Sequence, residues 1–213
     1  MSHSPSRHCP RAPQAHPQRR QHEVLSLHTS AGRRKYLDAA ERARFIGAAQ
    51  SSSLRLRALC LTLAFTGCRV SEALALGPDA LRRDEGVIAL RSLKKRSQAV
   101  VVREVPVPRE LLDELVELAG SQQRQGHDRL WLWGRVRAWQ LVKAVMRMAG
   151  IVSGPHQTAK GLRHAFGLHA VRSGVPINFV QRWLGHASMS TTAIYLQAIG
   201  PEERAIAARM WAT

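Results

Sequence analysis

The chain has 213 residues, of which 45% are hydrophobic, and it carries a formal charge of +17 from 32 Lys and Arg against 15 Asp and Glu. This length fits one domain of catalytic size plus an appendage, and the charge favours nucleic acid as the partner because so basic a chain repels itself without a polyanion nearby. The sequence offers no run of about 18 apolar residues, no compact secretory segment and no long basic amphipathic helix, which argues against a membrane protein and predicts a cytoplasmic one.

The first 34 residues differ in composition from the rest of the chain. They hold five of the ten histidines and four of the ten prolines, with almost no apolar periodicity. This composition predicts a disordered basic arm over residues 1–34, either a solvated tail or an arm that clamps DNA. We expect one folded domain over residues 35–213, with order beginning near Tyr36.

The folded part begins with three predicted helices, over residues 38–49, 54–65 and 71–77. Asp38 and Glu41 have the spacing of a capping box, in which each side chain accepts a backbone N–H of the other residue. Gly67 and the pair Gly77-Pro78 supply stop signals, because glycine adopts the left-handed conformation at a helix end and proline does not continue a helix.

The middle of the chain predicts a β-hairpin, and the rest is helical. Residues 87–90 and 99–107 alternate in polarity, and the polar residues 91–98 form the turn between them. Pro106 and Pro108 confine the second strand to an edge, because proline has no N–H for a neighbouring strand. Apolar spacing then predicts helices over residues 109–119, 136–149, 161–172, 177–184, 190–196 and 202–211. The predicted fold class is mainly α with a small antiparallel β-hairpin or sheet.

Five separated segments combine charged and reactive residues at expected loops and helix starts. In chain order they are Thr66-Gly67-Cys68-Arg69-Val70-Ser71-Glu72, Ser92-Leu93-Lys94-Lys95-Arg96, Lys160-Gly161-Leu162-Arg163-His164, Leu184-Gly185-His186 and Thr191-Thr192-Ala193-Ile194-Tyr195. Arg163 precedes His186 by 23 residues, and His186 precedes Tyr195 by nine. The order and joint spacing of these segments, within residues 36–211, resemble the tyrosine recombinases. The resemblance implies the catalytic-domain fold of that family and a site-specific reaction that cleaves and rejoins DNA strands through a 3′-phosphotyrosyl intermediate.

The residue types in these segments suit attack on a phosphodiester, which adds negative charge to the non-bridging oxygens. Arg69 and Arg163 are the expected clamp, since a guanidinium stays charged and holds phosphate through paired hydrogen bonds. His186 can add a hydrogen bond or orient the nucleophile. Tyr195 is the expected nucleophile, because a cationic pocket favours its phenolate and Tyr36 is the only other tyrosine.

Two lysines complete the catalytic set that the resemblance implies. Lys94, in the hairpin turn, donates a proton to the leaving 5′-oxygen in this interpretation, and Lys95 is the alternative because a shift of one residue exchanges the faces of a hairpin. Lys160 stands where most of the family carries histidine. A lysine serves more readily as a phosphate contact than as a base, and His156 is an alternative for the missing histidine.

Other residues have supporting interpretations. Glu72 is expected to pair with a basic side chain and stiffen the site, and His164 to be a packing residue with a satisfied ring. The cysteines, Cys9, Cys60 and Cys68, predict free thiols without a disulfide or metal framework. No carboxylate cluster suited to Mg²⁺ accompanies the motifs, so the reaction is expected to need no metal or other cofactor.

The resemblance also bears on partners. It implies double-stranded DNA as the substrate and a homo-tetramer on two DNA sites, with the helix at residues 202–211 either docked on its own core or exchanged with a neighbouring protomer. Most members place a helical core-binding domain before the catalytic one, where this chain has the arm. Two other functions remain open, a type IB topoisomerase-like enzyme and a DNA-binding regulator without catalysis. Assembly on two DNA sites, as opposed to relaxation of one plasmid by a monomer, separates a recombinase from a topoisomerase.

Overall fold

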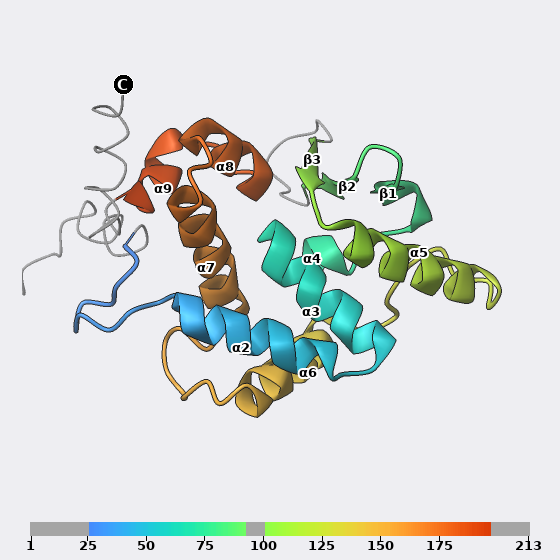
Figure 1. The fold of residues 1–213 in the computed structure, drawn as a ribbon, viewed down its shortest axis with the longest axis horizontal. Helices are drawn as coiled ribbons and strands as arrows, with labels where there is room; N and C mark the ends of the chain where they lie inside the picture. Colours follow the sequence, from blue (N-terminus) through green and yellow to red (C-terminus); the bar gives the residue numbers. More distant parts are fainter. Residues whose placement is uncertain (1–25, 93–100, 197–213) are drawn as a thin grey trace, which may run out of the picture.

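The structure is a computed structural model of the chain, and it describes residues 26–92 and 101–196 (Figure 1). Within these residues the helices are α2 (Ala39–Gln50), α3 (Leu54–Thr66), α4 (Val70–Ala73), α5 (Arg109–Gln123), α6 (Arg135–Met148), α7 (Ala159–Arg172), α8 (Ile177–Leu184) and α9 (Met189–Ala193). A short 3₁₀ helix, η1 (Pro78–Ala80), precedes the strands β1 (Leu81–Arg82), β2 (Val87–Arg91) and β3 (Val102–Pro106). The mainly helical fold class with a small antiparallel sheet is confirmed. None of the helices in the described ranges is long and apolar enough to cross a membrane.

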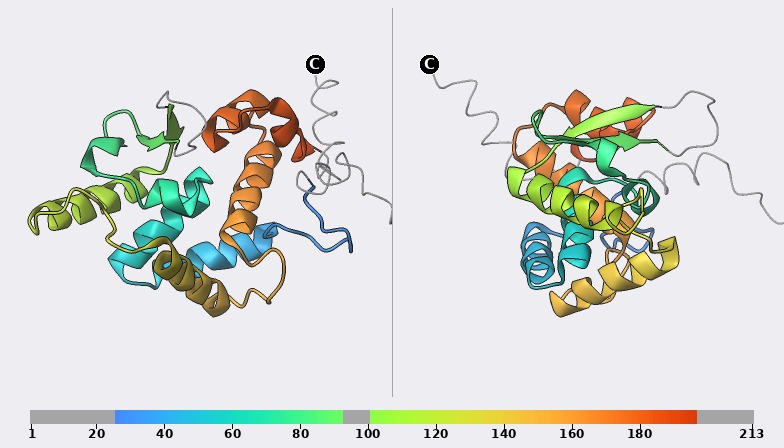
Figure 2. Two further views of the ribbon diagram at one scale, coloured as in Figure 1. Left: turned by 180° about the vertical axis from the view of Figure 1, so that it is seen from behind. Right: turned by 90° about the vertical axis from the view of Figure 1, so that its right-hand side faces the viewer.

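Helix α3 is the centre of the fold. It lies between α7 on one side and α5 with the sheet on the other, and α2 and α6 pack beside it (Figures 1 and 2). Every residue from 58 to 64 is buried, as expected for a helix that is apolar nearly all round. A second apolar cluster joins α7, α8 and the residues Ile194 and Tyr195 that follow α9. The C-terminal ends of α3 and α8 meet near this cluster, and the motif residues gather at that junction.

Capping side chains determine where helices α2 and α7 begin. The predicted capping box of α2 is confirmed, because the Glu41 N–H donates to Asp38 Oδ1 at 2.8 Å and the Asp38 N–H donates to Glu41 Oε2 at 3.1 Å. Helix α7 begins at Ala159, ahead of the start predicted from apolar spacing. The cause is a cap that the spacing did not reveal: the Thr158 hydroxyl accepts the Gly161 N–H at 2.9 Å.

The predicted hairpin is confirmed and belongs to a three-stranded sheet of order β1-β2-β3. β2 and β3 pair antiparallel in the register that places Arg91 opposite Val102. β3 lies at the edge, as Pro106 indicated. β1 was not predicted, because a strand of two residues is too short to show alternation. The tip of the hairpin, residues 93–100, lies outside the described residues.

Residues 26–37, which we call the strap, lead into α2. Their course is fixed by hydrogen bonds such as the one from the Lys35 N–H to the Leu27 carbonyl at 2.7 Å. Leu27 is 5% exposed and belongs to the second apolar cluster. Ordered structure therefore reaches back into the arm predicted over residues 1–34, because a buried leucine anchors it there. Residues 1–25 lie outside the described residues.

Candidate active site

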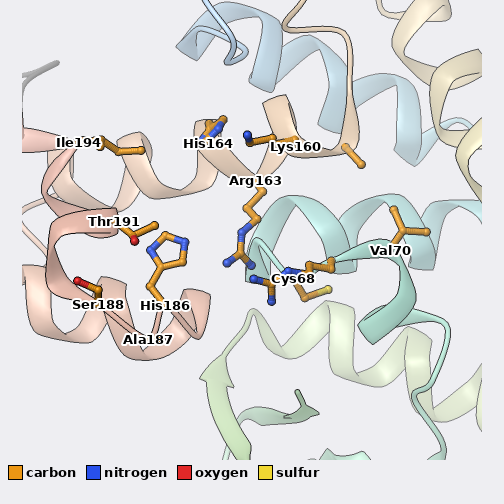
Figure 3. Close-up of a pocket in the computed structure, with 12 residues that line it drawn as sticks. Cys68, Val70, Lys160, Arg163, His164, His186, Ala187, Ser188, Thr191 and Ile194 are labelled. Carbon is orange, nitrogen blue, oxygen red and sulfur yellow. The ribbon is translucent and has the colours of Figure 1, made fainter. Parts of the chain in front are cut away.

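A pocket of about 490 Å³ opens between the first half of α7 and the turns that follow α3 and α8 (Figure 3). Its lining draws on four of the five motif segments and consists of Cys68, Arg69, Val70, Ala159, Lys160, Arg163, His164, His186, Ala187, Ser188, Thr191 and Ile194. Four of the six residues predicted to be catalytic are among them: Arg69, Lys160, Arg163 and His186. Among the described residues that line the pocket there is no carboxylate. The excess of cationic groups suits the pocket to an anion.

Arg163 joins the ends of two helices. Its guanidinium donates to the Gly67 carbonyl at 2.7 Å and to the Leu184 carbonyl at 2.6 Å, at the C-terminal ends of α3 and α8. The partial negative charge of a helix C-terminus favours a cation at this place. Burial and the neighbouring Arg69 lower the pKa of Arg163 to about 10, which still leaves it charged at neutral pH. Figure 3 shows the side chain reaching from α7 toward the segment around Cys68.

Glycines allow the two helix ends to meet. Gly67 follows α3 and Gly185 follows α8, both in the left-handed conformation with φ of 60° and 65°. A Cβ on Gly67 would lie 2.5 Å from Phe166 Cδ1 and 2.8 Å from Leu184 Cδ2. Glycine at residue 67 is therefore required by the backbone conformation and by space. The stop signal predicted there is confirmed.

The predicted pairing of Glu72 with a basic side chain is also confirmed, and two arginines take part. Arg69 Nη1 donates to Oε1 at 2.7 Å, and Arg103 Nη2 donates to Oε2 at 2.6 Å. Burial by itself raises the pKa of Glu72, but the hydrogen bond and charge of Arg103, with those of Arg69, outweigh it and hold the pKa below its ordinary value. The buried carboxylate stays ionised and orients Arg69 at the pocket.

Arg103 was missed in the sequence. It lies on β3, is 6% exposed, and donates from Nε to the Trp183 carbonyl at 2.8 Å as well as to Glu72. It thus ties the hairpin to the carboxylate that orients the pocket arginine and to the end of α8. Its partners are 31 and 80 residues away in the chain, so the one local signal is an arginine at an inward position of an alternating strand. Lys94 and Lys95 lie outside the described residues, on the hairpin that Arg103 anchors.

His186 is held through its backbone and its ring. Its N–H donates to the Gln181 carbonyl at 3.1 Å, and its own carbonyl accepts from Gln181 Nε2 at 3.2 Å. Its Nδ1 lies 3.0 Å from Oγ1 of the buried Thr192 on α9. Thr192 belongs to a motif segment, but the sequence did not assign it this orienting role. The contacts fix the ring at the pocket that it lines.

Lys160 lies at the exposed rim of the pocket, in the first turn of α7. Partial burial of its side chain and the neighbouring charge of Lys35 lower its pKa. His156, the alternative for the missing histidine, does not line the pocket. It is buried with Nε2 at 3.5 Å from Glu41 Oε1, a carboxylate that also accepts from Arg34 Nη2 at 2.6 Å. The structure therefore gives the His156 alternative no support.

Tyr195 lies behind the pocket wall and does not line it. Its side chain is completely buried, its ring stacks on His186 with centroids 6.3 Å apart and an interplanar angle of 15°, and its hydroxyl is 3.1 Å from His164 Nδ1. Burial raises the pKa of Tyr195 to about 12, against the opposing charge of Arg163. The expected cationic surroundings are present, but in this position burial is the larger effect and the phenol stays protonated.

The interpretation of His164 as a packing residue with a satisfied ring needs correction. The residue is 7% exposed and its Nδ1 contacts the Tyr195 hydroxyl, so it packs as expected. Its Nε2, however, is buried and has no hydrogen-bond partner among the described residues. A buried ring nitrogen without a hydrogen-bond partner costs free energy of folding, so packing alone does not explain a histidine at this position.

Comparison with known proteins agrees with this geometry. The sequence profile of the phage integrase family matches residues 35–199. The chain is 32% identical over 172 residues to tyrosine recombinase XerA of Pyrococcus furiosus, an alignment that covers 76% of this chain and 56% of that protein. The chain thus spans little more than half the length of this curated relative.

Solved structures share the fold. The crystal structure of XerA recombinase superimposes with a TM-score of 0.66 at 28% identity, covering 84% of this chain and 65% of that one. The catalytic domain of bacteriophage HP1 integrase superimposes with a TM-score of 0.57 at 22% identity, covering 81% of this chain and 93% of that one, and shows the fold alone. The predicted tyrosine recombinase catalytic-domain fold is confirmed. Because the family profile covers most of the chain, this protein belongs to the phage integrase family of tyrosine recombinases.

Proposed function

We propose that this chain is a site-specific recombinase that cleaves and rejoins DNA strands with Tyr195 as the nucleophile. The observation that supports this best is the convergence of Arg69, Arg163 and His186 on one pocket, with the Tyr195 ring stacked directly behind His186. These residues come from four separate segments, so only the folded domain brings them together. The similarity to a tyrosine recombinase supports the same activity.

In this proposal the scissile phosphodiester enters the pocket as an anion. Arg163, fixed by two backbone carbonyls, and Arg69, fixed by Glu72, hold the non-bridging oxygens where charge grows in the transition state. Both guanidiniums are oriented before the substrate arrives, so little reorganisation accompanies the reaction. His186, oriented by Thr192, donates a further hydrogen bond to one of these oxygens.

The covalent step exchanges one phosphodiester for another. The Tyr195 oxygen bonds to phosphorus, the bond from phosphorus to the 5′-oxygen breaks, the phenol proton is lost and the leaving oxygen gains one. The 5′-hydroxyl of the strand that was cleaved in the second DNA site then attacks the phosphotyrosyl bond, which reverses these events and releases the tyrosine. The phosphotyrosyl bond keeps the energy of the original linkage, so rejoining needs no ATP. The Tyr195 hydroxyl must first leave its buried position, because an atom without exposed surface does not reach DNA.

The lysines take the remaining roles in the proposal. Lys94 supplies the proton to the leaving oxygen, and Lys160 at the pocket rim contacts phosphate. A substrate with sulfur in place of the leaving 5′-oxygen tests the acid, because a thiolate departs without a proton. This substrate should restore cleavage by Lys94→Ala but not by Arg69→Ala. Restoration of Lys95→Ala instead would move the role by one residue, and restoration of neither would remove the hairpin from acid catalysis.

Double-stranded DNA in the cytoplasm is the proposed partner, with a homo-tetramer assembled on two DNA sites. The excess of basic residues supports DNA as the partner. We also propose a catalytic domain over residues 35–213 behind a basic arm over residues 1–34. The last part of this arm, residues 26–34, forms the beginning of the strap.

A deletion tests the proposed tetramer. Removing residues 200–213 should leave folding and DNA binding intact while synapsis fails. A collapsed melting transition in the truncated protein would instead favour a terminal segment docked on its own core.

Covalent trapping on nicked DNA tests the proposed function. Duplexes that cover inverted repeats flanking the gene are the candidate substrates, and a nick beside the scissile bond prevents rejoining. Wild-type protein should become linked to the 3′ end, whereas Tyr195→Phe should bind equally well and form no adduct. Tyr36→Phe is the matched control and should still form the adduct. An adduct with Tyr195→Phe would contradict the assignment of the nucleophile.

The same DNA substrates and variants distinguish the recombinase from the two alternative functions. A type IB topoisomerase-like enzyme would relax a plasmid as a monomer and would not pair two sites. A DNA-binding regulator would shift the duplex in a gel and form no covalent adduct with any variant. Wild-type adducts together with exchange between two sites support the recombinase.

A further inference from the structure

The surroundings of Tyr195 form a fitted seat on α7. Gly167 faces the phenol ring: a Cβ at this position would lie 2.6 Å from Cζ and 2.7 and 2.8 Å from the Cε atoms of Tyr195. Glycine in the middle of a helix weakens it, so its presence here is explained by the ring that packs on it. The His186 ring stacks on Tyr195 at a centroid separation of 6.3 Å. The phenol thus lies close against the backbone of α7.

His164 completes the seat with a hydrogen bond to the phenol oxygen. It lies one turn before Gly167 on α7, and its Nδ1 is 3.1 Å from the Tyr195 hydroxyl. Burial, with the charges of Lys160, Arg163 and Lys35, lowers the pKa of His164 to about 3, so the ring is neutral in neutral solution. A neutral ring with its hydrogen on Nε2 accepts the Tyr195 O–H at Nδ1. The pKa of Tyr195, raised to about 12 by burial, is consistent with a phenol that keeps its proton.

The seat is next to the pocket but closed to it. His164 lines the pocket, as Figure 3 shows, whereas Tyr195 does not, and no part of the Tyr195 side chain is exposed. Leu27 of the strap belongs to the same buried apolar cluster as Tyr195. A phosphodiester can therefore contact Arg163 and His186 while the nucleophile remains inaccessible. Binding and attack are separate events in this arrangement.

We propose that His164 and Gly167 hold the Tyr195 phenol protonated and outside the pocket, which makes His164 the positioning residue that governs when the nucleophile becomes available. This inference rests on the proposed function, because it assumes that Tyr195 is the attacking group. Removing the acceptor at His164 leaves a buried O–H without a partner and disfavours the seated phenol by about tenfold or more. Adding a methyl group at Gly167 occupies the seat and has the same consequence by a different route.

The seat is tested by the reactivity of Tyr195 toward tetranitromethane, which nitrates accessible tyrosines. The chain has two tyrosines, so in a Tyr36→Phe background Tyr195 is the one phenol, and its nitration is followed by peptide mass. His164→Phe removes the acceptor and keeps an aromatic ring. His164→Asn is the conservative variant, since its amide oxygen can take the place of Nδ1. Gly47→Ala is the matched control for Gly167→Ala, because a Cβ at Gly47 on α2 has no neighbour within 4 Å.

Nitration in the free protein should be slow with the native seat, about tenfold faster or more in His164→Phe and Gly167→Ala, and near the native rate in His164→Asn and Gly47→Ala. An unchanged rate in His164→Phe would overturn the proposal. Equal acceleration by His164→Phe and His164→Asn would do so too, because it would assign the effect to packing. If His164→Phe shows no melting transition and is therefore not folded, Gly167→Ala provides the test. Nitration of that variant at the native rate would overturn the proposal.

Cleavage of the nicked duplex gives a second readout. At saturating DNA, His164→Phe should cleave at least as fast as the native protein, because the phenol leaves the seat more easily. A loss of cleavage by 100-fold or so with unchanged nitration would make His164 a proton-transfer group and contradict the proposal. Nitration needs no DNA, so failure of the seat leaves the trapping result for Tyr195→Phe standing. Failure of that trapping experiment would in turn leave the nitration pattern intact.

Discussion

The two halves of the site are held in different ways. The half that we propose binds phosphate is braced by buried charge, with Arg163 on two backbone carbonyls and Glu72 between two arginines. The half that carries Tyr195 depends on α9, a helix of five residues, on an aromatic stack and on a hydrogen bond between neutral groups. The arginine half is therefore assembled without a ligand, whereas Tyr195, the proposed nucleophile, can move without breaking an ion pair.

In the proposed function, this division separates affinity for DNA from cleavage of DNA. Contacts with phosphate that are equally strong before and during the reaction strengthen binding but do not speed cleavage. An enzyme that cuts DNA can therefore bind its substrate tightly and still control the time of cleavage, if its nucleophile takes no part in those contacts. Conformational steps of this kind often set the rate of an enzyme. The two halves should accordingly respond differently to substitution: changes in the braced half should affect stability and chemistry together, and changes in the other half should affect chemistry with little effect on stability.

Glu72→Gln should have the largest effect, because it leaves the buried Arg103 without its counter-charge. Breaking a buried ion pair by removing one partner costs about 3–5 kcal/mol. The free energy of unfolding from urea titration should fall by this amount. Glu85→Gln is the matched control, since Glu85 pairs with Arg82 on the surface at 3.5 Å and should contribute little. Equal effects of the two variants would contradict the bracing of this half.

The same carboxylate predicts a pH dependence. The pKa of Glu72 in the folded protein lies below its ordinary value of 4.5. Its contribution to stability is therefore complete above the unfolded pKa and is lost as the pH falls through the lower pKa of the folded state. Denaturation between neutral and acid pH should show a shallower decline for Glu72→Gln than for the native protein.

Gly67→Ala should have the next largest effect, because it disturbs the junction that Arg163 spans. The left-handed conformation costs alanine about 1–2 kcal/mol, and overpacking against Phe166 and Leu184 adds about 1–3 kcal/mol. Gly86→Ala isolates the first contribution, since Gly86 has φ of 70° and its Cβ would meet nothing within 4 Å. Urea titration of both variants should show the larger loss at Gly67. Equal losses would mean that the junction yields to an added methyl group.

Arg69→Lys should lower single-turnover cleavage by about 100- to 1,000-fold while the protein stays folded. A lysine keeps the charge but replaces a planar fork with a point charge, so it does not contact both Glu72 and phosphate in the same geometry. Arg83→Lys is the control, because Arg83 pairs with Asp113 on the surface, and it should cleave at the native rate. Near-native cleavage by Arg69→Lys would reduce the role of Arg69 to simple charge.

The sequence predicted what depends on local rules. The capping pair Asp38 and Glu41 determined where α2 starts, and Gly67 determined where α3 ends, because each signal lies within a few residues of its effect. The motif spacing placed Arg69, Arg163 and His186 in one pocket for a related reason: it reproduces the pattern of a known fold. Their catalytic roles, like that of Tyr195, stay predictions.

The sequence did not predict contacts between residues that are far apart in the chain, nor properties that depend on how deeply a residue is buried. Arg103 contacts Glu72 and Trp183 across the fold, and the one local signal, an arginine at an inward position of an alternating strand, does not identify these partners. Leu27 looked like part of an arm because Val24, Leu25 and Leu27 form too short an apolar group to show periodicity, and only the cluster that contains Leu27 explains its order. The protonated state of Tyr195 followed from its burial, a quantity that charge counting in the sequence does not contain.

Thr192→Val should have the smallest effect and probes the half that carries Tyr195, the proposed nucleophile. Valine keeps the shape of the buried threonine but removes the hydroxyl that lies 3.0 Å from His186 Nδ1. Loss of one orienting hydrogen bond of about 1 kcal/mol should slow single-turnover cleavage by about fivefold to tenfold, with DNA binding unchanged. Thr62→Val is the matched control, because Thr62 is also buried but its hydroxyl bonds only the Ala58 carbonyl of its own helix among the described residues, at 2.7 Å. That variant should change stability slightly and cleavage not at all. If Thr192→Val lost as much stability as Glu72→Gln, the nucleophile half would be braced like the other, and the contrast between the two halves would be wrong.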